Sequence, residues 1–344
     1  MAEATGPARP VWQRVLAHIL LVFFSAVFIM PFVWLVSSSV KPDSQIFRTP
    51  PEWIPKQPVM VSVGGEEHPV YEGPAGERVG LIERLPQEGE VRVVPAVGGA
   101  DTMLIPQERF DAYEPVREFG LEWSNYPEGL RFINFGQQLT NTLIVCISSA
   151  FGAVLSCSLV AYGLARVPWR GRNGLFYVIL ATMMIPPQVT MVPLFVVFAK
   201  LGMVNTFWPL ILPMFFAPGF FVFLLRQFFL GIPQDLTDAA RIEGCGEFAI
   251  YWRIALPLSK PALATVALFA FLQAWNDYLG PLIYLSDEAK YTLSLGIASF
   301  SSQYGSFPGM LMAVSTVMTV PIIILFFFTQ RTFIQGITLT GLKG

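Results

Sequence analysis

The sequence predicts an all-α polytopic membrane protein with six transmembrane helices and a small β-rich extracytoplasmic insert between the first and second helices. The first observation is composition, because 53% of the 344 residues are hydrophobic and only 13% are charged. A soluble protein averages about 25% charged residues. The second observation is that the apolar residues gather into long runs, each able to cross roughly 30 Å of hydrocarbon.

The first apolar run extends from Val15 to Val40 and contains no acid, lysine or arginine. A cleaved signal peptide is the competing interpretation, but the apolar core of such a peptide is usually about 7 to 15 residues long. We therefore expect an uncleaved span, and residues 1–40 form a short cytosolic N-terminus followed by this first helix.

Residues 41–138 form a polar segment that we expect outside the cytoplasm. Its centre, about 58–121, is acidic: residues 58–122 hold 13 acids and 5 bases, a net charge of −8. Short alternating apolar stretches between turn residues indicate strands. Strands are expected near 59–63, 80–85 and 91–94, and a helix near 108–119.

Five further apolar runs make residues 139–332 the rest of the membrane core. They lie at about 141–165, 174–199, 206–229, 262–285 and 309–330. Proline interrupts two of these runs, at Pro186, Pro187, Pro193, Pro209, Pro213 and Pro218. Because proline removes a backbone donor, kinked or broken helices are expected there.

Lysine and arginine in the short loops indicate which side of the membrane each loop occupies. With both termini in the cytosol, eleven of these residues lie inside and two lie outside. The inner set is Arg9, Arg14, Arg166, Arg170, Arg172, Arg226, Arg241, Arg253, Lys260, Arg331 and Lys343, and the outer set is Lys200 and Lys290. Since basic short loops favour the cytosolic side, the tail 333–344 and the polar loop 235–261 are predicted to be cytosolic.

The loop 235–261 carries the most informative motif. It reads Asp-Ala-Ala, three residues, Gly, nine residues, Ile-x-Leu-Pro, formed by Asp238, Ala239, Ala240, Gly244, Ile254, Leu256 and Pro257. Periodicity predicts a helix over 236–243, a glycine bend and a second helix over 247–256 that ends at the Leu-Pro pair. Periodicity alone also describes an ordinary amphipathic connector at the membrane surface.

The motif resembles the "EAA" loop of permease subunits of ATP-binding-cassette importers, with Asp238 where the family usually has Glu. Four other stretches, 41–55, 183–206, 275–285 and 336–344, are similar to carbohydrate permeases of the maltose-transporter type. The insert is a departure from that type, which usually connects the first two helices briefly. The resemblance implies that the loop docks into a groove of an ATPase subunit.

The same resemblance implies the partners of the chain. They are a second, unlike permease subunit, two copies of an ATP-binding subunit and an extracytoplasmic solute-binding protein, in the lipid bilayer of the inner membrane and without nucleic acid. It also implies that the tail, with Gly341 and Lys343, inserts between the two ATPase subunits. The alternative for the tail is a frayed end of the sixth helix.

No motif for catalysis or nucleotide binding occurs in the chain. The phosphate-binding loop Gly-x-x-x-x-Gly-Lys-Ser/Thr is absent, as are the usual hydrolase and metalloprotease motifs. The cysteines, Cys146, Cys157 and Cys245, suggest neither a disulfide framework nor a metal cluster. We expect no enzyme activity and no cofactor or metal in this chain, with ATP bound by the partner subunit.

Gln273, Asn276 and Asp277 are the candidate residues of a substrate path. They lie on the predicted fifth span at roughly one-turn spacing, and ionisable groups inside a membrane are commonly functional. The alternative is that Asp277 lies near the outer interface and only caps or pairs locally.

The predicted function is the permease of an importer that carries a carbohydrate, an oligosaccharide above all, and is driven by a separate ATPase. The alternatives are a permease for a polyol phosphate or another polar solute, and a membrane receptor or scaffold whose cytosolic loop binds a different partner.

Overall fold

The structure is a computed structural model that describes residues 11–63, 65–85, 89–96, 102–302 and 305–338. Most of these residues are helical. The chain divides into two compact units, the first formed by Met1–Gly129 with Gly305–Thr316 and the second by Leu130–Tyr304 with Val317–Gly344.

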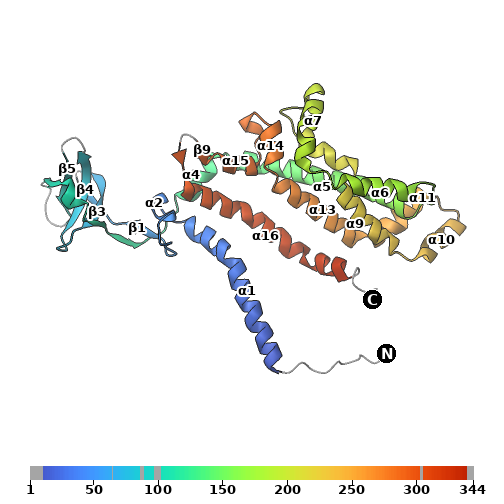
Figure 1. Ribbon diagram of the computed structural model, residues 1–344, viewed down its shortest axis with the longest axis horizontal. Helices are drawn as coiled ribbons and strands as arrows, with labels where there is room; N and C mark the ends of the chain where they lie inside the picture. Colours follow the sequence, from blue (N-terminus) through green and yellow to red (C-terminus); the bar gives the residue numbers. More distant parts are fainter. Residues whose placement is uncertain (1–10, 64, 86–88, 97–101, 303–304, 339–344) are drawn as a thin grey trace. The chain divides into compact units, whose positions relative to one another are not determined.

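The elements follow one another as labelled in Figure 1. The α-helices are α1 (Val11–Ser38), α2 (Asp43–Ile46), α3 (Gln107–Phe110), α4 (Asn125–Phe132), α5 (Phe135–Ala165), α6 (Arg172–Thr182), α7 (Pro187–Lys200), α8 (Trp208–Ile211), α9 (Gly219–Leu230), α10 (Gln234–Ile242), α11 (Glu247–Ile250), α12 (Leu256–Leu258), α13 (Lys260–Trp275), α14 (Leu279–Tyr284), α15 (Leu293–Ala298) and α16 (Pro308–Thr338). The 3-10 helices are η1 (Leu212–Phe216) and η3 (Glu288–Lys290), and η2 (Tyr251–Ala255) is a π-helical turn. The strands are β1 (Lys56–Pro58), β2 (Met60–Val63), β3 (Glu66–Glu72), β4 (Arg78–Leu85), β5 (Glu90–Pro95), β6 (Met103–Pro106), β7 (Glu114–Pro115), β8 (Arg117–Phe119), β9 (Ser301–Ser302) and β10 (Gly305–Ser306).

Several helices have the length and hydropathy of membrane spans. In the described part of the chain, four segments are long and apolar enough by themselves: Val11–Ser38, Phe135–Ala165, Trp208–Leu230 and Pro308–Gln330. Two pairs of helices reach this length and hydropathy only when each pair is taken together. They are Arg172–Thr182 with Pro187–Lys200, bent by 97°, and Glu247–Leu258 with Lys260–Trp275, bent by 80°. Counting each bent pair as one span gives up to six, so six spans stay a prediction.

The breaks predicted from proline are present. The bend between α6 and α7 falls just before Pro187, which starts α7 at a position where no backbone donor is needed. In the next span, α8 passes into the 3-10 helix η1 and then, after Pro218, into α9. Each interruption therefore has a local cause in the sequence.

The first unit contains a small antiparallel sheet. Strands β2 to β6 lie side by side in chain order, and β7 pairs with β3. Its core is formed by Val79, Val91, Val93, Phe110 and Tyr113. The helix expected over 108–119 is wrong: α3 ends at Phe110, and Glu114 and Pro115 pair with β3 instead. Pro115 cannot continue a helix without losing a hydrogen bond.

The second unit is built around α5, against which α9 and α13 pack. Small residues at intervals of four along α5, namely Ala153, Cys157 and Ala161, are fully buried. Small side chains let membrane helices approach closely. Bulky residues of the neighbouring elements, among them Leu225, Phe229 and Ile250, fill the core around them.

The first residues of the predicted tail 333–344 are helical. Helix α16 continues past the candidate span Pro308–Gln330 to Thr338, and the cytosolic position of this tail stays a prediction. The stretch 333–338 holds no proline, so its backbone can extend the preceding helix. Gly341 and Lys343, the predicted tail contacts, lie outside the described residues.

Candidate coupling loop and membrane pocket

The loop 235–261 forms the predicted helix, glycine bend and helix. The first helix, α10, ends at Ile242, and Gly244 then adopts a left-handed conformation with φ of 84°. The amides of Gly244 and Cys245 donate to Arg241 O at 3.0 Å and to Ala240 O at 2.9 Å. These bonds satisfy carbonyls at the helix end, as a left-handed glycine commonly permits. Gly246 is extended and precedes α11.

The second helix does not end at the Leu-Pro pair as predicted. It continues through the π-helical turn η2 and α12 to Leu258, and the chain then bends by 80° into α13. Pro257 lies in the first turn of α12, directly after the wider π-helical turn, and it has no backbone N–H to donate to that turn. Leu-Pro therefore marks a change of helical pitch within the loop.

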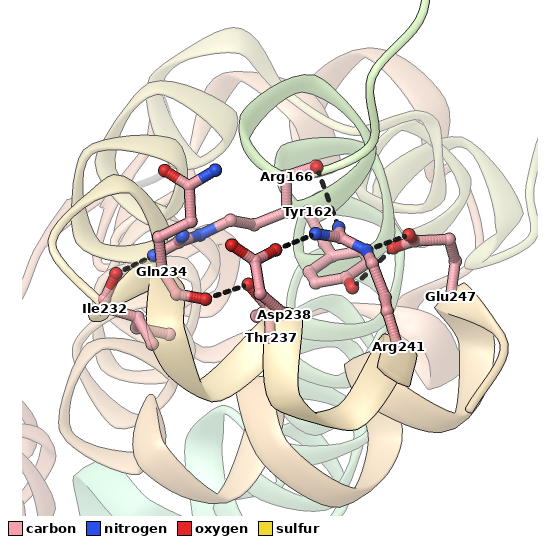
Figure 2. Close-up of polar contacts among 8 residues, drawn as sticks. All are labelled: Tyr162, Arg166, Ile232, Gln234, Thr237, Asp238, Arg241 and Glu247. Carbon is pink, nitrogen blue, oxygen red and sulfur yellow. Dashed lines mark hydrogen bonds and ion pairs between the residues drawn. The ribbon is translucent and has the colours of Figure 1, made fainter. Parts of the chain in front are cut away.

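A carboxylate at the start of α11 joins the loop to α5 (Figure 2). The hydroxyl of Tyr162 donates to Glu247 Oε2 at 2.9 Å, and Arg241 Nε donates to Glu247 Oε1 at 2.9 Å. Arg241 Nη1 also lies 2.8 Å from Asp238 Oδ1. The hydrogen bond from Arg241 to Glu247, followed by the charges of both carboxylates, raises the pKa of the Arg241 guanidinium.

Arg166 extends this network towards α9, also seen in Figure 2. Its Nε donates to Phe229 O at 2.8 Å, and its Nη2 donates to Ile232 O. Phe229 lies in the last turn of α9, where helix carbonyls lack intrahelical partners, and Ile232 follows shortly after the helix ends. Arg241 Nη2 in turn donates to Arg166 O at 3.4 Å. The guanidinium of Arg166 therefore ties the end of α9 to the end of α5.

The predicted loop residues divide between an inner and an outer face. Ala240 is buried, and Ile254 and Leu256 are partly buried against the core. Asp238, Ala239, Gly244 and Pro257 are exposed. Sequence reasoning missed Tyr162, Arg166 and Glu247. The interval of four between Tyr162 and Arg166 would have placed both on one helical face.

Large apolar side chains lie exposed on the loop. Ile242 is 88% exposed, Phe248 is 70% exposed and Trp252 is 61% exposed. All three lie in the loop 235–261, and Phe248 and Trp252 belong to the segment Glu247–Leu258, which reaches the hydropathy of a span only together with α13. Exposed apolar groups of this size are typical of surfaces that bind another protein.

A pocket of about 360 Å³ lies among α7, α8, η1, α13 and α14. Gln273 and Asp277 line it. Asn276 is not among the lining residues, and its side-chain amide donates to Leu272 O at 2.8 Å. The prediction that all three lie on one helical span is wrong. Helix α13 ends at Trp275, and Asp277 lies in the break before α14.

Asp277 makes a local bond in this break. Its Oδ1 accepts from the amide of Gly280 at 3.0 Å, which agrees with the alternative that the carboxylate caps locally. The same residue nevertheless lines the pocket, and the other lining residues with amide or hydroxyl groups are Gln188, Thr190, Gln273 and Tyr284. The remaining lining is largely apolar and contains no lysine or arginine. Such a pocket suits a neutral polar solute better than an anion.

The sequence of this chain matches one known protein family. The family described as "Binding-protein-dependent transport system inner membrane component" matches residues 135–339. The chain belongs to this family. The match begins at α5 and includes the pocket and the loop 235–261, which we call the coupling loop after its predicted role, while the small sheet of the first unit lies outside it.

Several curated relatives share this region. An arabinooligosaccharides transport system permease protein, AraQ, of Halalkalibacterium halodurans is 42% identical over 216 residues, which is 63% of this chain and 76% of the relative. The diacetylchitobiose uptake system permease protein NgcG of Streptomyces coelicolor is 34% identical over 212 residues, 61% of this chain and 70% of the relative. The sn-glycerol-3-phosphate transport system permease protein UgpE of Yersinia enterocolitica is 34% identical over 205 residues, 59% of this chain and 73% of the relative.

One solved structure shares the fold over nearly the whole chain. A bacterial ABC transporter involved in the import of the acidic polysaccharide alginate contains a chain that superposes with a TM-score of 0.65 at 19% sequence identity. The match covers 95% of this chain and 99% of that chain. The predicted identification as an inner-membrane permease subunit of an ABC importer is confirmed.

Proposed function

We propose that this permease forms part of the membrane path of an ATP-driven importer for a neutral carbohydrate, above all an oligosaccharide. The relatives named for arabinooligosaccharides and diacetylchitobiose support this substrate class. The amide and hydroxyl groups of the pocket can exchange hydrogen bonds with sugar hydroxyls, and its apolar walls suit the faces of sugar rings.

A polyol phosphate is the second candidate, because of the similarity to UgpE. Phosphate recognition usually requires arginine, lysine or clustered backbone donors. The pocket instead presents the carboxylate of Asp277 and has no basic side chain. An ionised phosphate beside that carboxylate would be repelled, so the neutral sugar is favoured.

The observation that carries the proposal is the coupling loop, with its inner face bonded to α5 and its outer face apolar and exposed. We infer that Asp238, Ala239 and Gly244 dock against a separate ATP-binding subunit, with Ile242, Phe248 and Trp252 beside them. ATP is bound and hydrolysed there, and this chain acts as the transport subunit. Ile254 and Leu256 pack against the core and position the loop on the membrane helices, and the exposed Pro257 lies beside them at the end of the loop.

The proposed assembly contains a second, unlike permease, two ATP-binding subunits and an external solute-binding protein. The family description "binding-protein-dependent" supports the last of these partners. Six spans with both termini in the cytosol would place the small sheet outside and the coupling loop inside. The tail residues Gly341 and Lys343 would then lie on the ATPase side.

Transport by the reconstituted complex tests this function. The permease would be assembled with its partner subunits in proteoliposomes, and ATP-dependent uptake of neutral oligosaccharides and of polyol phosphates would be compared. Uptake of a neutral oligosaccharide that requires the external binding protein is the expected result. Uptake of the phosphate alone would reverse the substrate choice, and no ATP-dependent uptake of any solute would reject the function.

A further inference from the structure

We propose that Glu247 is a positioning residue that locks the coupling loop to α5, so that the loop and this membrane helix move as one body. The inference rests on the proposed function, because it concerns how movement of the ATPase subunit would reach the membrane. It adds a residue outside the Asp-Ala-Ala, Gly and Ile-x-Leu-Pro positions of the motif.

The two oxygens of Glu247 have different partners from different elements. Oε1 accepts from Arg241 in the last turn of α10, and Oε2 accepts from Tyr162 near the end of α5. The bond to Arg241 alone would only hold α10 and α11 together across the bend. The bond to Tyr162 adds the membrane helix, so one carboxylate joins three elements (Figure 2).

The C-terminal end of α5, with the residue that follows it, provides all the contacts of this junction. Ser158 Oγ lies 2.8 Å from the hydroxyl of Tyr251 in η2, and the rings of Tyr162 and Tyr251 have centroids 5.3 Å apart. Arg166 O accepts from Arg241. Ser158 and Tyr162 are four residues apart, which places their side chains on one side of α5, and Arg166, which follows the end of α5, contributes its backbone oxygen. Both helices of the loop are therefore held by this end of α5.

This junction and the proposed docking surface are formed by different side chains, although Asp238 of the docking surface also pairs with Arg241 of the junction, which Tyr162→Phe leaves unchanged. Tyr251 is buried, whereas Ile242, Phe248 and Trp252 point outward and are largely exposed. A change at the junction should therefore leave docking intact while loosening the loop from α5. That separation makes the inference testable apart from the docking proposal.

Two variants break the junction with little change of shape. Tyr162→Phe removes one hydroxyl, and Glu247→Gln removes the charge that binds Arg241. Glu243→Gln is the matched control, because it removes a carboxylate from the same loop at an exposed position. Hydrogen exchange would be measured on the full-length permease in nanodiscs, and solute transported per ATP would be measured in the assembled complex.

In Tyr162→Phe, exchange should rise about tenfold in the loop and at the end of α5 together, as expected for one lost hydrogen bond to a charged group. In Glu247→Gln, whose amide oxygen can still accept from Tyr162, the rise should be largest at the bend between α10 and α11, where the bond to Arg241 is lost. The ATPase subunits should still copurify, while solute transported per ATP should fall several-fold relative to Glu243→Gln. Unchanged exchange at residues 158–166 in Tyr162→Phe, or normal transport per ATP with the junction opened, would overturn the inference. Failure of the unmodified permease to bind any ATPase subunit would instead reject the proposed function.

Discussion

Replacing Gly244 by alanine should weaken the bend of the coupling loop for a purely conformational reason. Its φ of 84° lies in the left-handed region, where an L residue with a Cβ is strained by roughly 1–2 kcal/mol. An added Cβ would meet no atom within 4 Å, so steric overlap adds nothing in the isolated chain. The strain alone should raise the population of the open loop roughly 5- to 30-fold.

Gly246 provides a matched control two residues away. An added Cβ there also meets no atom within 4 Å, but its φ is −72°, which any residue adopts. Gly246→Ala should therefore be neutral or stabilise the loop by less than about 1 kcal/mol, because alanine restricts the unfolded chain. The two variants differ in backbone conformation and not in available space.

Hydrogen exchange at residues 244 and 245 reports the strain directly, because these amides donate to Arg241 O and Ala240 O. Exchange should accelerate in Gly244→Ala and stay near the original rate in Gly246→Ala. ATP-driven uptake should fall in the first variant, with normal membrane insertion in both. Equal effects of the two substitutions, or no effect of Gly244→Ala, would refute the reasoning from φ.

Three further predictions concern other parts of the chain. Asp277→Leu should lower uptake at unchanged expression. Asp277→Asn is the milder variant, because it keeps an oxygen that accepts from the Gly280 amide. Normal uptake in both variants would leave no role for Asp277 in the path. A membrane-impermeant maleimide should label Cys245 from the cytosolic side only, since the other two cysteines are buried, and labelling from outside would reverse the orientation. The hydrogen bond from the Tyr113 hydroxyl holds the pKa of Glu77 below its usual value. This bond therefore stabilises the folded sheet at any pH above the usual pKa of a glutamate, and the stabilisation is lost as the pH falls through the lower pKa of the folded state. The melting temperature of Tyr113→Phe should therefore lie below that of the unmodified protein at pH 7 and approach it in acid, and a difference independent of pH would contradict this.

The features that depend on local sequence were predictable. Long apolar runs predicted the helices, proline predicted the broken ones, and Gly244 predicted the bend because the left-handed region favours glycine. The small sheet lies in the segment whose alternation indicated strands, although its place outside the cytoplasm stays a prediction.

The features that depend on a local break in the backbone without proline, or on contacts between distant segments, were not predictable. Asp277 was placed within a helix because the apolar run continues past it, yet the backbone breaks at Asn276 and the carboxylate binds the Gly280 amide. The link from Glu247 to Tyr162 joins residues 85 positions apart, and no periodicity reveals such a pair. Strand β7 likewise forms because β3 offers a partner, which the sequence of 108–119 alone does not contain.

The most direct test of the central claim is photo-crosslinking from Ile242, the most exposed of the apolar residues on the coupling loop. A photoreactive residue at this position would be activated in native membranes, and the adduct would be identified by mass spectrometry. The expected result is an adduct with an ATP-binding subunit that contains the phosphate-binding loop absent from this chain. Adducts only with lipid, or only with a protein that binds no ATP, would contradict it.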